Sequence, residues 1–316
     1  MLAQTDGPAA HDVMFYDGDD ELVEAVRGYV VAGLKSGDAT VVVATAAHAS
    51  ALEVALRASD IDPDAARQEG LLLCLDARIL LGRFMAGDRP RAVAFDAELG
   101  TILRRAGASG RGVRVFGEMV AVLWEEGNVL AAIELEDLWN RLLRRLSFAL
   151  LCAYRAGAVS DDGHVGAFAE VCHLHSAVCG AGSPTRRIVE TRAFPAAGRS
   201  AEDARRFVAS ALRGWGDERL AFDAALVVTE LAANALTHSG SAFVVGVSVM
   251  AREARLWVRD SSAAVPVRHH PDRLADHGRG LALVDAIATR WGYDAVEGGK
   301  VVWASLPGEA PPAVAL

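Results

Sequence analysis

The sequence predicts an α/β protein with two domains: a mostly parallel sheet with helices on both faces, then an α/β sandwich with one layer of helices on a mixed sheet. Its 316 residues exceed what one core comfortably holds. Short apolar runs alternate with helical patterns up to residue 179, and the order then changes. A Gly-, Ser- and Pro-containing break at residues 180–184 separates the two parts. We place the domains at residues 11–180 and 188–308.

The first part contains short strand-like runs with helical patterns between them. Residues 40–45 are the clearest strand, because a continuous β-branched run is typical of a buried parallel strand. Apolar residues at helical spacing predict helices over residues 22–34 and 50–58. The other predicted strands are residues 13–16, 71–75, 92–95, 113–116 and 148–154.

The second part begins with helices. Residues 202–215 and 221–237 have helical periodicity, and so have residues 279–290 near the end of the domain. Strands are predicted at residues 243–250, 253–260 and 301–306. Because the third helix separates the last two strands, a mixed sheet is expected.

Composition and charge restrict the function classes. The formal net charge of −9 argues against a nucleic-acid surface, since phosphate contacts need clustered Lys and Arg. No N-terminal segment has the pattern of a secretory signal, and no uninterrupted apolar run reaches the roughly 18 residues that span a bilayer. A cytoplasmic protein without membrane or nucleic-acid contacts is therefore predicted.

One helix of the second part carries polar residues on a single face. Glu230, Asn234 and His238 are four residues apart and are flanked by apolar positions such as Leu231. Polar groups in such a setting need a reason to be half-buried. A solvent-facing stripe on a surface helix is the alternative.

Two further motifs follow in the chain. Asp260 ends an apolar strand, where a carboxylate can accept a hydrogen bond from the amino group of a heterocycle, although Asp is also common in turns. Gly278, Arg279, Gly280 and Leu281 open the last helix. Glycines at a helix start let backbone N–H groups approach phosphate. The order of the three motifs is more informative than any one of them.

On these motifs, about 115 residues resemble the GHKL ATPase fold, and within it the anti-sigma-factor serine kinases of the sigma-B type switch. The resemblance implies that ATP and Mg²⁺ bind here. It implies Glu230 as general base, Asn234 as Mg²⁺ ligand and Asp260 as the adenine-binding residue. In that family Gly often stands two residues after the adenine-binding Asp, where this chain has Ser262.

The same resemblance implies that Gly278, Gly280 and Leu281 belong to the phosphate-binding lid. Arg279, between the two glycines, could reach phosphate. The short segment between Pro266 and Gly278 fits the anti-sigma group better than GHKL proteins with large lids.

The first part resembles the MEDS sensory domain. The resemblance rests on residues 11–16, on the turn at residues 33–38 and on Cys152-Ala153-Tyr154. It implies a RecA- or KaiC-like fold without nucleotide chemistry, and no G-x-x-x-x-G-K-[ST] pattern follows a predicted strand. Glu118 follows a strand at the place where such folds carry a catalytic carboxylate, and a plain loop residue is the alternative.

Cysteine is sparse, but one segment invites a metal reading. Cys172, His175 and Cys179 have helical spacing and could supply three zinc ligands from one face. The alternative is a helix with two buried thiols and a partly exposed His, since no fourth ligand stands nearby in the sequence.

The predicted function combines both parts. A sensory domain would regulate a kinase that binds ATP and Mg²⁺ and phosphorylates a serine of an anti-anti-sigma partner. The resemblance also implies a sigma-factor partner and a homodimer. The alternatives are a catalytically inactive ATP-binding or sigma-binding module, and a sensor histidine kinase. No phospho-accepting helix pattern follows His175, which argues against the last.

Overall fold

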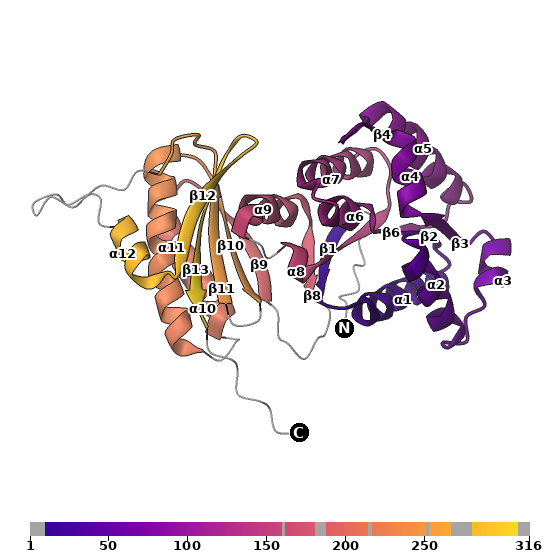
Figure 1. Ribbon diagram of the computed structural model, residues 1–316, viewed down its shortest axis with the longest axis horizontal. Helices are drawn as coiled ribbons and strands as arrows, with labels where there is room; N and C mark the ends of the chain where they lie inside the picture. Colours follow the sequence, from indigo (N-terminus) through magenta and orange to yellow (C-terminus); the bar gives the residue numbers. More distant parts are fainter. Residues whose placement is uncertain are drawn as a thin grey trace, which may run out of the picture. The chain divides into compact units, whose positions relative to one another are not determined.

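The computed structural model describes residues 10–159, 162–180, 188–213, 217–250, 253–266 and 280–308. The chain divides into two compact units (Figure 1). The N-terminal unit contains the residues up to 161 together with residues 174–182, and the C-terminal unit contains residues 162–173 and those from 183 onward.

The N-terminal unit is built on a six-stranded sheet in the order β3-β2-β6-β7-β1-β8. Each pair of neighbouring strands is parallel. The strands are β1 (Ala10–Tyr16), β2 (Ala39–Ala44), β3 (Leu72–Asp76), β6 (Val113–Gly117), β7 (Ala149–Arg155) and β8 (Ala177–Gly180). The short strands β4 (Met85–Ala86) and β5 (Arg89–Pro90) form a separate hairpin.

Helices cover both faces of this sheet, so the predicted fold class is confirmed (Figure 1). On one face, α1 and α2 pack against a core that includes Val42 and Phe116. On the other, Phe95 of α5 and Trp139 of α7 meet edge to face with ring centroids 5.1 Å apart. The helices are α1 (Asp19–Ser36), α2 (Ala46–Arg57), α3 (Pro63–Gln68), α4 (Ala77–Phe84), α5 (Ala92–Ala106), α6 (Met119–Glu125), α7 (Val129–Leu143) and α8 (Ala156–Val159).

The strand predicted at residues 92–95 is wrong, because these residues begin helix α5. Phe95, Leu99 and Leu103 are four residues apart and all buried. This spacing continues the apolar pattern around a helix, so the four-residue run Ala-Val-Ala-Phe is only its first turn.

The C-terminal unit contains a five-stranded sheet in the order β12-β13-β11-β10-β9. Its strands are β9 (Ile188–Phe194), β10 (Phe243–Met250), β11 (Glu253–Asp260), β12 (Arg290–Val296) and β13 (Gly299–Pro307). Every neighbouring pair is antiparallel, which corrects the expectation of a mixed sheet. Strand β12 was not predicted, and its hairpin with β13 reverses the chain, so that β13 lies antiparallel to β11 instead of parallel.

A layer of helices covers one face of this sheet, as predicted (Figure 1). It consists of α10 (Ser200–Arg213), α11 (Glu218–Ser239) and α12 (Gly280–Ile287). Alternate residues of β11, namely Ala254, Leu256 and Val258, join the core beneath them. Helix α11 is long and apolar enough to cross a membrane by length and composition alone, but half of that window is buried inside this unit. It is the central core helix.

A fourth helix of the C-terminal unit comes from the sequence before the break. After a 3₁₀ turn (Asp162–His164), α9 (Val165–Leu174) packs on the other face of the sheet. Phe168 meets Trp257 of β11 edge to face, with ring centroids 5.3 Å apart. The indole of Trp257 lies against Gly246 of β10, where a Cβ would collide with the ring.

Candidate nucleotide site

Helix α11 presents the first two polar residues of the predicted site. Asp217 caps the helix by accepting a hydrogen bond from Leu220 N at 2.8 Å. Glu230 and Asn234 are half-buried one turn apart, while His238 in the last turn is exposed. The structure therefore places Glu230 and Asn234 on a helix face that borders the core, and His238 beyond it.

The start of α12 lies directly against Glu230. A Cβ at Gly280 would come too close to Glu230 Oε2, so the end of the Glu230 side chain would have to move to accommodate it. Leu281, predicted to contact the cofactor, is 8% exposed and its side chain packs in the hydrophobic core. Only its backbone is left for a ligand. Gly278 and Arg279 lie outside the described residues.

Asp260 ends β11 as a buried carboxylate with two partners. Its Oδ1 accepts hydrogen bonds from Lys300 Nζ at 2.9 Å and from Ser262 N at 2.8 Å. Both groups contact the same oxygen. Within the described part of the chain, Asp260 Oδ2 accepts no hydrogen bond, which leaves one carboxylate oxygen for a ligand.

The loop after Asp260 forms without glycine. Asp60 is the one non-glycine residue with a positive φ in the described ranges, so Ser262 does not occupy the left-handed region that favours glycine. The carbonyl of Ser262 accepts a hydrogen bond from Lys300 Nζ at 3.1 Å. The replacement of the family's glycine by Ser262 is thus compatible with a closed turn around Asp260.

Sequence reasoning missed Lys300, which the structure brings to this site from β13. Lys300 is 6% exposed and forms a buried ion pair with Asp260. One feature of the sequence could have indicated it: Lys300 stands directly before the apolar run Val-Val-Trp. A lysine in such a run is expected to be buried, and a buried lysine requires a partner of opposite charge. The partner itself, 40 positions away, could not be deduced from that signal.

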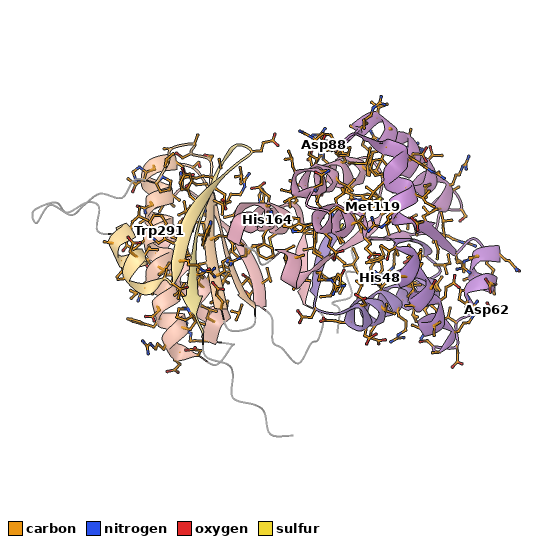
Figure 2. The ribbon with its side chains drawn as sticks, viewed as in Figure 1. His48, Asp62, Asp88, Met119, His164 and Trp291 are labelled. Carbon is orange, nitrogen blue, oxygen red and sulfur yellow. The ribbon has the colours of Figure 1, made fainter. Side chains whose placement is uncertain are left out.

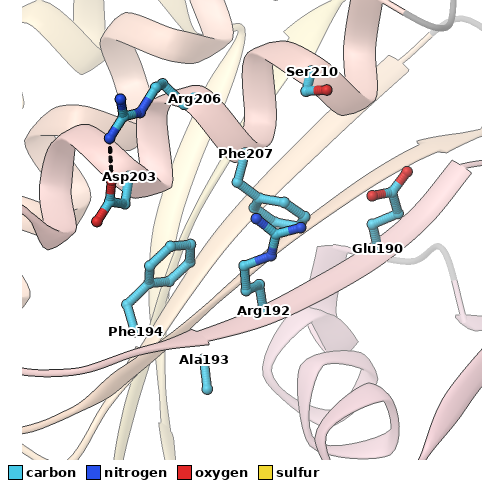
Figure 3. Close-up of a pocket in the computed structure, with 8 residues that line it drawn as sticks. All are labelled: Glu190, Arg192, Ala193, Phe194, Asp203, Arg206, Phe207 and Ser210. Atoms are coloured by element: carbon cyan, nitrogen blue, oxygen red, sulfur yellow. Dashed lines mark hydrogen bonds and ion pairs between the residues drawn. The ribbon is translucent and has the colours of Figure 1, made fainter.

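Two cavities in the C-terminal unit lie away from these residues. One, of about 410 Å³, is bounded by β9 and α10 (Figure 3). There the guanidinium of Arg192 lies 4.6 Å from the ring centre of Phe207, and Arg206 pairs with Asp203. A second, of about 520 Å³, is bounded by α10 and α11. None of the predicted nucleotide-binding residues lines either cavity.

Glu118, the second candidate acid, is buried at the end of β6. Its carboxylate accepts a hydrogen bond from Thr45 N at 2.7 Å and pairs with His48 Nδ1 at 2.5 Å (Figure 2 labels His48). This hydrogen bond, which outweighs burial, raises the pKa of His48. Glu118 therefore joins the ends of β2 and β6 at the edge of a parallel sheet where ligands commonly bind.

The sequence leaves open a metal site on one helical face or a helix with two buried thiols and a partly exposed His, and the structure contradicts both. Helix α9 ends at Leu174, and residues 177–180 form strand β8, so Cys172, His175 and Cys179 do not share a helix. Cys172 is buried in α9, and burial raises the pKa of its thiol. His175 is buried in the N-terminal unit, while the side chain of Cys179 lies outside the description.

Comparisons with known proteins agree with both units. The family model described as MEDS, the MEthanogen/methylotroph, DcmR Sensory domain, matches residues 10–176, more than half of the chain. The chain belongs to the MEDS family. A second family model, described as a histidine kinase-like ATPase domain, matches residues 194–306. No curated protein matches the chain. The molecule is thus a MEDS sensory domain followed by a histidine kinase-like ATPase domain.

The residues after the MEDS match fit ATP and Mg²⁺, which such ATPase domains generally bind. Asn234 offers an amide oxygen of the kind that Mg²⁺ accepts as a ligand. Gly280 has no side chain to cover the backbone N–H groups at the start of α12, so phosphate can approach them beside Glu230. A Cβ would fill this space. Asp260 Oδ2 can accept a hydrogen bond from an adenine amino group.

Proposed function

We propose that this MEDS protein is an anti-sigma-type serine kinase that uses ATP and Mg²⁺ to phosphorylate an anti-anti-sigma partner. The observation that carries the proposal is the placement of Gly280 against Glu230. It puts a half-buried carboxylate beside the helix start that would face phosphate. A carboxylate in that position is suited to accept the proton of an attacking serine hydroxyl.

Each residue has a distinct part in this proposal. Asp260 selects adenine through Oδ2, while Lys300 and Ser262 fix its other oxygen. Asn234 holds Mg²⁺, which neutralises charge on the phosphate oxygens when bound. Glu230 takes the serine proton as the serine oxygen forms its bond to the terminal phosphorus and ADP leaves.

Regulation by the sensory part is supported by helix α9. The MEDS match includes α9, yet α9 packs within the C-terminal unit. Glu170 of α9 forms an ion pair with Arg259, the residue that precedes Asp260 on β11. The backbone N–H of Gly166 donates to Asp294 Oδ2 at 2.8 Å. A shift of α9 would therefore act on the strand that carries the adenine-binding carboxylate.

The proposal includes two protein partners, the anti-anti-sigma protein and a sigma factor. In such a switch the unphosphorylated anti-anti-sigma protein would bind the kinase, and its phosphorylation would free the kinase domain to hold a sigma factor. A homodimer in the cytoplasm fits this class of regulator. A pure ATP-binding or sigma-binding module, or a sensor histidine kinase, would be recognised by the experiment below.

The proposal is tested first by calorimetry of ATP binding with and without Mg²⁺. Wild type should bind ATP in a Mg²⁺-dependent way, and Asp260→Ala should weaken binding at least tenfold. Glu230→Gln should keep ATP binding and lose transfer of labelled phosphate to anti-anti-sigma proteins offered as substrates. The phosphorylated product should be acid-stable phosphoserine.

Asp223→Asn is the matched control, since Asp223 lies on the same helix and, among the residues that the structure describes, pairs only with the exposed Arg219, at 4.0 Å. It should leave binding and transfer unchanged. ATP binding without transfer in wild type would identify a binding module. Acid-labile phosphate on the chain itself would identify a histidine kinase, and no ATP binding would refute the nucleotide site.

A further inference from the structure

Four side chains with metal-binding atoms meet inside the N-terminal unit, away from the nucleotide site. They are His11, Glu136, Cys152 and His175, and their ligand atoms all lie within 4.8 Å of one another. All four residues are buried, and the side chains of Glu136 and His175 have no exposed surface. We call these four residues the polar cluster.

The fold brings the polar cluster together from two strands, a helix and a connecting segment. Strands β1 and β7 are adjacent and parallel, so that His11 and Cys152 lie on neighbouring strands. Helix α7 covers this face and contributes Glu136. His175 stands just before β8, the strand on the other side of β1.

Four distances within the polar cluster lie close to those of a tetrahedral zinc site, and three of them join His11, Cys152 and one oxygen of Glu136. Zinc bonds of 2.0–2.3 Å imply separations of about 3.3–3.6 Å between neighbouring ligand atoms. His11 Nε2 lies 3.4 Å from Cys152 Sγ and 3.1 Å from Glu136 Oε2. Cys152 Sγ lies 3.3 Å from Glu136 Oε2, and His175 Nε2 lies 3.4 Å from Glu136 Oε1.

Neighbouring residues form hydrogen bonds to the side chains of the polar cluster and orient them, as the residues that surround metal ligands do in metal sites. Asn140 Nδ2 donates to Leu174 O at 2.8 Å, which points Asn140 Oδ1 at His11 Nδ1, 3.0 Å away. Because that oxygen can only accept, Nδ1 carries the proton and Nε2 keeps its lone pair. Tyr154 donates to Glu136 Oε1 at 2.7 Å.

Charge is also balanced for a divalent ion. One carboxylate, one thiolate and two neutral imidazoles would together neutralise a 2+ ion in a dry interior.

We propose that the polar cluster binds one divalent transition-metal ion, with Zn²⁺ the best fit to its two nitrogen, one oxygen and one sulfur ligands. Binding converts the thiol of Cys152 to a metal-bound thiolate and releases its proton to solvent. Since the ligands come from residues 11, 136, 152 and 175, the ion would close long loops and stabilise the sensory domain.

The competing explanation is a hydrogen-bonded network without metal, in which the Cys152 thiol donates to Glu136. Burial, and then the charge of Glu136, raise the pKa of Cys152 well above its usual value. In that case the thiol would stay protonated and no metal would be retained.

The full chain, purified without chelators, should contain about one zinc ion per molecule by elemental analysis. Refolding with Co²⁺ should give tetrahedral d–d bands together with a thiolate-to-cobalt charge-transfer band. The Co²⁺ spectrum requires no variant, so it decides the proposal even if substitutions prevent folding. Metal below a tenth of an ion per chain, with no charge-transfer band, would overturn it.

Variants identify the ligands. Cys152→Ser should abolish the charge-transfer band, and His175→Gln should lower retained zinc at least tenfold while circular dichroism still shows a folded chain. Cys172→Ser is the matched control, because Cys172 is an equally buried thiol outside the polar cluster. Loss of metal in the Cys172 variant but not in the Cys152 variant would contradict the assignment.

Discussion

Lys300 Nζ lies 2.9 Å from Asp260 Oδ1, and both side chains are at least nine-tenths buried. This ion pair holds the carboxylate assigned to adenine. Lys300→Met should destabilise the protein by roughly 3–5 kcal/mol, because it leaves a buried charge without its partner. It should also weaken ATP binding. Urea denaturation gives the first quantity and calorimetry the second.

The double variant Lys300→Met/Asp260→Asn is the control for this prediction. It removes both charges, so it should recover part of the lost stability but none of the lost ATP affinity. If the single variant were as stable as wild type, the pair would not be buried as described.

Gly280→Ala should lower ATP affinity by about tenfold. The added Cβ would crowd the helix start that would face phosphate and would displace Oε2 of Glu230, and tenfold in affinity corresponds to about 1.4 kcal/mol. Calorimetry measures the affinity. The control is Gly28→Ala in α1, where a Cβ meets nothing within 4 Å. It should raise stability by about 0.5–1 kcal/mol and leave ATP binding unchanged.

The ion pair of His48 with Glu118 should make stability pH-dependent. The pKa of His48 is raised in the folded chain above 6.5, mainly by its hydrogen bond to Glu118 and further by Asp19. A raised pKa adds stability that is fully present below pH 6.5 and is lost as pH rises through the folded value. The stability difference between wild type and His48→Gln should therefore shrink with rising pH.

Urea denaturation at a series of pH values measures this difference. His238→Gln is the control, since His238 is exposed at the end of α11. A difference between wild type and His48→Gln that grew with pH would mean that His48 is held neutral beside Glu118.

Phe168→Ala should destabilise the C-terminal unit by about 3–5 kcal/mol, because it removes a buried ring that packs on Trp257. The emission of Trp257 should shift as its surroundings become wetter. Thermal denaturation followed by tryptophan fluorescence measures both effects. Phe222→Ala, at a ring that is 61% exposed on α11, should change neither by a comparable amount.

Much of the fold could be predicted because its strongest patterns are local. The run at residues 40–45 became β2, and the periodicity of residues 221–237 became most of α11. Strands β9 and β12 were missed because both lie at sheet edges and mix charged with apolar residues. An edge strand with one wet face lacks the continuous apolar run that marks a buried strand.

The candidate sites were predictable to the extent that their residues lie on one element. Glu230 and Asn234 share a helix, so their common face follows from spacing alone. The pairing of Lys300 with Asp260 depends on the register of β13 beside β11, which the missed strand β12 determines. The polar cluster joins three elements and a connecting segment that are far apart in the sequence, and only His175 among its members was considered as a ligand.

The contact of Trp257 with Gly246 has an evolutionary consequence. Since any side chain at position 246 would displace the indole, the two positions should change together among homologues. Gly292 and Trp303 repeat the arrangement on β12 and β13, where the ring again occupies the space of a Cβ. Lineages that lose either glycine should also lose the facing tryptophan. Where Trp257 is lost, Phe168 no longer has the indole on which its ring packs, so position 168 should vary as well.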